Sequence, residues 1–149
     1  MRRVVQDDWD RPRRDAWSNA LDAAVRDSGP GVVLVAHSLA CLLVAHWAAS
    51  SRHAIHGALL VAVPDPSSPA FPAEAVGFSP LPMHRLPFPS LIVASSDDPY
   101  GSLAHAHRCA SAWGSRIVEA GAAGHLNAAC GLGMWPEGLA WLNEVVHQD

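Results

Sequence analysis

The chain has 149 residues, of which 50% are hydrophobic and 16% are charged, and its formal net charge is −4 at pH 7. This length and composition predict one domain, residues 1–149, with enough apolar side chains for a packed core. The acidic balance argues against a nucleic-acid partner, and the lack of any run near ~20 apolar residues argues against a membrane partner.

In chain order, apolar runs alternate with helical patterns. We expect a short strand at residues 3–6, a helix at 16–27, a strand at 32–36, a helix at 39–50 and a strand at 57–63. A proline-rich irregular segment follows at 64–89, then a strand at 91–95, a helix at 102–113, a strand at 116–119 and a helix at 136–147. Several strands are continuous apolar runs, which is typical of parallel strands covered on both faces. The pattern predicts an α/β fold, a three-layer sandwich with a mostly parallel sheet.

Two helix ends depend on particular residues. We expect Asp15 to cap the first helix, and Pro136 to open the last helix as its first residue. The spacing in the last helix predicts four inward apolar side chains, those of Leu139, Leu142, Val145 and Val146.

The stretch Ala36-His37-Ser38-Leu39-Ala40 lies where a β-branched strand turns directly into a helical segment. A serine at such a corner, with small residues two positions away on each side, is the form of a nucleophile elbow, normally written G-x-S-x-G. Alanine replaces both glycines here and is the next smallest residue. The alternative is a plain strand-to-helix turn in which Ser38 is the N-cap. This stretch alone leaves both interpretations open.

Candidate chemistry follows three of the predicted strands at their carboxyl ends. Ser38, the pair Asp97 and Asp98, and His125 come in this order along the chain. Ligands of parallel sheets bind at this edge, where residues from different strands can meet. A serine hydroxyl needs a base such as imidazole, and the imidazole needs a carboxylate that holds the right tautomer. Ser…Asp…His is also the order expected of α/β-hydrolases.

Three stretches, residues 33–41, 95–100 and 124–129, carry a family resemblance. The chain resembles the small serine hydrolases related to the retinoblastoma-binding hydrolase, within the α/β-hydrolase superfamily. The resemblance extends from Val4 onward. It implies Ser38 as nucleophile, His125 as base and Asp98, in preference to Asp97, as the acid partner. It also implies that the backbone N–H of Leu39 is one donor of the oxyanion hole, which binds the negative oxygen of the reaction intermediate.

The chain departs from this family at its beginning. The family opens with a further strand, and the loop after that strand supplies the second oxyanion donor. Such a unit takes about 30 residues, but this chain opens directly at what looks like the family's second strand, the one predicted at residues 3–6. We therefore expect a truncated α/β-hydrolase fold with an incomplete oxyanion hole. Loss of one donor costs on the order of 10²–10³ in rate.

The predicted function is hydrolysis of a small ester, thioester or amide, with a small-molecule or peptide substrate and no cofactor or metal. The alternative is a truncated, weakly active or inactive hydrolase-like protein that acts through protein binding. Trp9 and Trp135 lie on predicted loops and are candidates for lining the substrate cleft. The oligomeric state stays open.

The cysteines and histidines outside these motifs suggest no metal site. Cys41, Cys109 and Cys130 are odd in number and scattered, which favours a reducing, cytoplasmic setting. We expect Cys41 in the core, and Cys130 is a weak candidate nucleophile because it lacks the strand-turn-helix context. His105 and His107 are two residues apart on a predicted helix, so they point to different sides, and we expect both at the surface.

Overall fold

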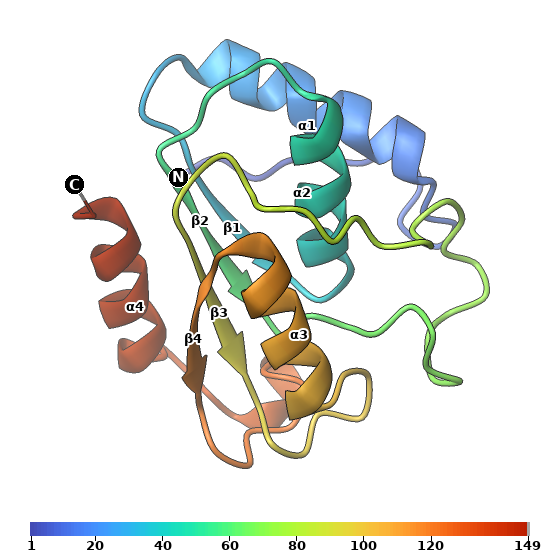
Figure 1. The fold of residues 1–149 in the computed structure, drawn as a ribbon, viewed down its shortest axis with the longest axis vertical. Helices are drawn as coiled ribbons and strands as arrows, with labels where there is room; N and C mark the ends of the chain where they lie inside the picture. Colours follow the sequence, from blue (N-terminus) through green and yellow to red (C-terminus); the bar gives the residue numbers. More distant parts are fainter. Residues whose placement is uncertain (149) are drawn as a thin grey trace.

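A parallel four-stranded sheet forms the middle layer of the structure, a computed structural model that describes residues 1–148 (Figure 1). The strands are β1 (Val33–His37), β2 (Gly57–Val61), β3 (Ser90–Ala94) and β4 (Arg116–Glu119). Their order in the sheet is that of the chain, and each neighbouring pair is parallel. All four carboxyl ends therefore meet at one edge of the sheet.

Helices cover both faces of this sheet. They are α1 (Arg14–Ser28), α2 (Leu39–Ser50), α3 (Leu103–Trp113) and α4 (Pro136–Val146), with a short 3-10 turn, η1, at Ala128–Cys130. Helices α2 and α3 pack on one face, and α1 packs against α2. Helix α4 stands on the opposite face (Figure 1). The predicted α/β sandwich with a parallel sheet is thus confirmed.

The core lies on both sides of the two central strands. Successive side chains of a strand point to opposite faces, so Leu60 and Ile92 pack towards α1–α3, whereas Leu59 and Val93 pack towards α4. Every residue of β2 and β3 is buried, which explains why both strands are continuous apolar runs. Helix α2 is buried from Cys41 to Trp47 and fills the space between the sheet and α1.

Strand β1 is different, because within residues 1–148 it pairs on one side only, with β2. The Ser38 N–H donates to the Val61 carbonyl oxygen, and the Val32 carbonyl oxygen accepts from the His56 N–H. Backbone groups alternate along a strand, so those of Val33, Val35 and His37 point to the free edge. Val35 is 55% exposed.

Most of the predicted elements are confirmed to within two residues, but three details are wrong. Residues 3–6, all of them described, form no strand, because no strand lies beside them; Gln6 is buried and donates to the Trp17 carbonyl oxygen instead. Asp15 does not cap α1, which begins one residue earlier, after Arg13.

The third error concerns the orientation of α4. Val145 is buried, but Leu139 is 59% exposed and Val146 is 40% exposed. The face that the helix turns to the sheet runs through Gly138, Leu142 and Val145, at positions i, i+4 and i+7. Leu139 and Val146, each one position after a residue of this face, point away from it.

Candidate active site

Ser38 stands at the corner between β1 and α2 in a conformation that few side-chain-bearing residues adopt. Its φ is 56° and its ψ is −124°, and such positive φ values are typically held in place by surrounding structure. Here the Ser38 N–H donates to the Val61 carbonyl oxygen at 2.9 Å, and its carbonyl oxygen accepts from the Cys41 N–H at 2.9 Å. Among the described residues, the hydroxyl makes no capping hydrogen bond to α2. The side chain is therefore turned away from the helix.

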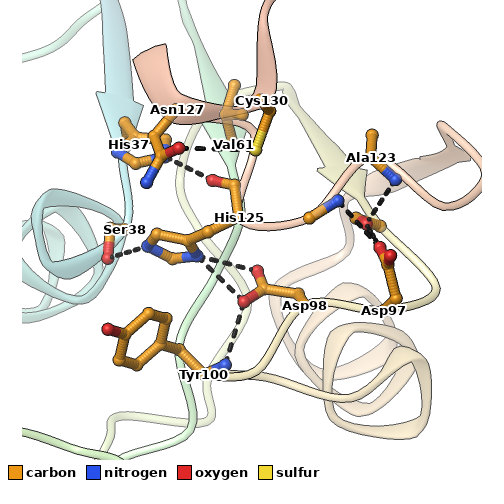
Figure 2. Close-up of polar contacts among 12 residues, drawn as sticks. His37, Ser38, Val61, Asp97, Asp98, Tyr100, Ala123, His125, Asn127 and Cys130 are labelled. Carbon is orange, nitrogen blue, oxygen red and sulfur yellow. Dashed lines mark hydrogen bonds and ion pairs between the residues drawn. The ribbon is translucent and has the colours of Figure 1, made fainter.

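His125 comes from the loop after β4 and connects two other side chains (Figure 2). Its Nε2 lies 2.8 Å from Ser38 Oγ, and its Nδ1 lies 2.9 Å from Asp98 Oδ1 and 3.0 Å from Oδ2. A carboxylate only accepts, so Nδ1 carries the proton, and Nε2 is left to accept from the Ser38 hydroxyl. The side chains of His125 and Asp98 are 11% and 2% exposed. The imidazole is thus held in one tautomer and largely shielded from water.

Asp97 and Asp98 follow β3 as direct neighbours but serve different partners. Asp98 Oδ1 also accepts from the Tyr100 N–H at 2.9 Å. Asp97 Oδ1 accepts from Ser95 Oγ at 2.8 Å and from the Gly124 N–H at 2.7 Å. These hydrogen bonds, the one from Ser95 first, lower the pKa of the Asp97 carboxyl. Asp97 thereby connects the loop after β3 to the loop that carries His125.

The backbone N–H of Leu39, the first residue of α2, belongs to the unpaired first turn of a helix. Within residues 1–148 it has no hydrogen-bond partner. It follows directly after Ser38 and lies at the positive end of the helix dipole. This N–H can therefore donate to a negative oxygen formed at Ser38.

A cavity of about 460 Å³ adjoins the group formed by Ser38, His125 and Asp98. This volume suits a small ligand. The proline-rich segment lines it with Asp65, Ser67 and Ser68, and the loop after β3 lines it with Ser96, Asp98 and residues 99–103. Tyr100 is among these lining residues, and its ring centroid lies 4.6 Å from that of the His125 ring. Asp98 and Tyr100 are therefore the residues through which the cavity borders the group of Ser38, His125 and Asp98.

Neither Trp9 nor Trp135 is among the described residues that line this cavity. The Trp9 ring packs against Trp17 with 5.5 Å between ring centroids. The Trp135 ring packs in the same way against Trp141, at 5.6 Å. The structure thus brings Ser38, Asp98, His125 and Leu39 together, whereas the two tryptophans make contacts typical of packing residues.

The other histidine and cysteine predictions have mixed outcomes. His107 is exposed and pairs with Glu119 at 2.8 Å, as predicted for a surface residue. The prediction for His105 is wrong: it is buried, and its Nε2 donates to the Pro64 carbonyl oxygen at 2.9 Å, because the segment after β2 passes over α3. Cys41 is buried as predicted. Among residues 1–148, no group of His, Cys, Asp or Glu side chains could hold a metal ion.

Two residues near His125 were not singled out from the sequence. His37 Nε2 lies 2.8 Å from the His125 carbonyl oxygen, and the Tyr100 ring lies against the imidazole. In the sequence, His37 is next to Ser38, and Tyr100 comes two residues after Asp98. These positions were the only signals of a role at the site, and adjacency in sequence does not predict where a ring points.

Comparisons with known proteins show the family and the fold of the chain. The profile of the Serine hydrolase family matches residues 1–144. No curated protein sequence matches the chain. A protein from Pectobacterium atrosepticum described as a YdeN-like hydrolase is similar to it, with 31% identity and a TM-score of 0.85 over 98% of this chain and 76% of that chain.

Two more distant structures show the fold alone. The ydeN gene product of Bacillus subtilis has 21% identity and a TM-score of 0.76, over 93% of this chain and 77% of that chain. The type II thioesterase BorB from the borrelidin biosynthetic cluster has 17% identity and a TM-score of 0.68, over 91% of this chain and 74% of that chain.

In residues 1–148, no helix is long and apolar enough to cross a membrane.

Proposed function

Because the chain belongs to the serine hydrolase family, we propose that it cleaves a small ester, thioester or amide with Ser38 as nucleophile, His125 as base and Asp98 as the orienting acid. One observation carries this proposal: the two ring nitrogens of His125 contact Asp98 at 2.9 Å and Ser38 at 2.8 Å. The backbone strain at Ser38 supports it, since such strain clusters at functional sites.

In the proposed reaction, Ser38 Oγ attacks the substrate carbonyl carbon while His125 Nε2 takes the hydroxyl proton. Asp98 stabilises the imidazolium that forms and keeps Nδ1 protonated. The tetrahedral intermediate then collapses: the bond to the leaving group breaks, and His125 gives its proton to that group. Water, activated by the same imidazole, hydrolyses the acyl-Ser38 ester and regenerates the hydroxyl.

The negative oxygen of the tetrahedral intermediate needs donors already in position. The Leu39 N–H is the proposed first donor, supported by its place directly after Ser38 at the start of α2. We propose that residues 1–149 lack the strand and loop that supply the second donor in relatives of the retinoblastoma-binding hydrolase. The free edge of β1 supports this, as does the extra length of the Pectobacterium atrosepticum protein, 76% of which is matched.

Labelling with a fluorophosphonate probe, which reacts with activated serines, tests the proposal. We expect the native chain to be labelled and Ser38→Ala to be unlabelled, because the probe needs the Ser38 hydroxyl. Ser111→Ala is the matched control, since Ser111 is exposed on α3. If the labelling does not depend on Ser38, the proposal that this chain is an enzyme is wrong. An N-terminally extended chain that labels faster would support the missing donor, and one that labels no faster would argue against it.

The second candidate, a weakly active or inactive hydrolase-like protein that binds other proteins, is favoured by the same free edge. Unpaired strand edges are ready templates for pairing with another chain. Under this alternative, the native chain and Ser38→Ala show the same low labelling, and both bind the partner equally well.

A further inference from the structure

His37 is the last residue of β1, directly before Ser38, and its ring reaches across to the loop that carries His125 (Figure 2). The His37 Nε2 lies 2.8 Å from the His125 carbonyl oxygen. A carbonyl oxygen only accepts, so Nε2–H of His37 is the donor. The two imidazole rings meet edge to face, with 4.8 Å between their centroids.

This bond adds a third point of attachment for His125. Asp98 and Ser38 hold the two ring nitrogens, and His37 holds the main chain of the same residue. Because His37 and Ser38 are consecutive, one strand end fixes both the backbone of His125 and the hydroxyl that its ring must meet. A displacement of the His125 loop relative to β1 would break both contacts at once.

The loop is held from the β3 side before His125, where the Gly124 N–H donates to Asp97 Oδ1 at 2.7 Å, and less firmly after it. Leu126 has φ 51° and Gly124 has φ 58°, so both residues that flank His125 are in the left-handed region. The Leu126 N–H donates to the Ala123 carbonyl oxygen at 3.2 Å, the upper end of the usual range for such a bond. An external donor on the His125 carbonyl is therefore well placed to fix the loop.

We propose that His37 is a positioning residue, whose Nε2–H holds the main chain of His125 so that the imidazole stays within hydrogen-bond reach of Ser38. This inference rests on the proposed function of Ser38 and His125. It assigns a role to the residue before the nucleophile, a position that the G-x-S-x-G pattern leaves variable.

Three substitutions separate this role from a merely structural one. His37→Leu removes the donor. His37→Gln places an amide N–H at about the distance of Nε2 along the side chain, whereas the shorter His37→Asn places it near the position of Nδ1. His53→Leu is the matched control, because His53 is exposed and lies between α2 and β2, at the opposite edge of the sheet.

The measurements are the rate of fluorophosphonate labelling at Ser38, kcat/KM for p-nitrophenyl acetate and the midpoint of thermal unfolding. We expect His37→Leu and His37→Asn to lose roughly 10- to 100-fold in both rates, the scale of a small misplacement of reacting groups. We expect His37→Gln to recover most of the rate, and His53→Leu to label as the native chain does. Unfolding midpoints of the three His37 variants should be similar.

Wild-type rates in His37→Leu would overturn the inference, as would equal losses in His37→Gln and His37→Leu. If the native chain shows no Ser38-dependent labelling, the proposed function fails, and the inference is then decided by NMR. The downfield resonance of the His125 Nδ1 proton should be present in the native chain and His37→Gln but broadened beyond detection in His37→Leu. A resonance unchanged in His37→Leu would overturn the inference in that case also.

Discussion

Strands β1 and β3 both end at the candidate site, but they are supported very differently. Strand β3 lies between β2 and β4, and all five of its residues are buried. Strand β1 has one neighbour within the described residues, and its Val35 is 55% exposed. The carboxylates Asp97 and Asp98 thus follow a fully buried central strand, whereas Ser38 follows an edge strand.

This difference shows how the two halves of the site are held. The acid half depends on the core of the sheet, and its loop is fixed by hydrogen bonds of Asp97 and Asp98. The nucleophile half depends on local contacts, namely the bonds of Ser38 to Val61 and Cys41 and the contact of His37 with His125. Regions with few buried contacts open at lower free energy than core strands do. We therefore expect disturbances of β1 to affect catalysis before they affect global stability.

The largest expected effect comes from the acid half. Asp98→Asn should lower kcat by about 10⁴-fold while the chain stays folded, because an amide no longer selects the Nδ1–H tautomer or stabilises the imidazolium. The measurement is kcat for p-nitrophenyl acetate hydrolysis. Asp97→Asn is the matched control and should lose much less. If the two variants lose equally, the assignment of Asp98 as the acid partner is wrong.

A core substitution tests the contrast in stability. Ile92→Ala in β3 should lower the free energy of unfolding by about 2–5 kcal/mol, because Ile92 is fully buried and the change leaves a cavity. Val35→Ala in β1 should change it by no more than about 0.5 kcal/mol, the usual range for surface positions. Urea unfolding followed by tryptophan fluorescence gives both values. Similar losses in the two variants would contradict the comparison.

The smallest expected effect concerns pH and Asp97. Its hydrogen bonds to Ser95 and Gly124 lower the pKa of the folded carboxyl below that of the unfolded chain. A carboxyl whose pKa is lower in the folded chain stabilises the folded state at any pH above the pKa of the unfolded chain. This contribution is lost as the pH falls through the pKa of the folded chain. The unfolding midpoint of the native chain should therefore exceed that of Asp97→Asn by a constant amount at neutral pH.

Below about pH 4, the ordinary range of an Asp carboxyl, this difference should shrink towards zero. Asp7→Asn, which removes an exposed carboxylate, serves as control. A difference between the native chain and Asp97→Asn that grows as the pH falls has the wrong sign for this explanation.

Much of the fold could be predicted from the sequence, because buried parallel strands are continuous apolar runs and their order in this sheet is their order in the chain. The same geometry explains why Ser38, Asp98 and His125, each placed after a predicted strand, lie together in the structure. Sequence periodicity could not predict contacts that depend on a distant partner. His105 is buried because the Pro64 carbonyl lies over α3, and His37 meets a carbonyl 88 residues further along the chain.

The strand predicted at residues 3–6 failed for a related reason. Its composition suits a strand, but a strand also needs a neighbour with which to form hydrogen bonds, and the described residues place none there. The inward residues of α4 were likewise chosen from spacing alone. Spacing identifies the apolar side chains of α4, but only packing against β2 and Trp135 decides which of these side chains are buried.

The distribution of the three cysteines gives the chain a built-in attachment point for a reporter group. Cys41 and Cys109 are buried, and burial raises the pKa of both thiols, that of Cys109 to about 12, so neither forms much thiolate at neutral pH. Cys130 is partly exposed, and its sulfur packs against Gly124, the residue before His125. A maleimide dye on the native chain should therefore attach at Cys130. Its fluorescence would follow movement of the His125 loop without any engineered cysteine.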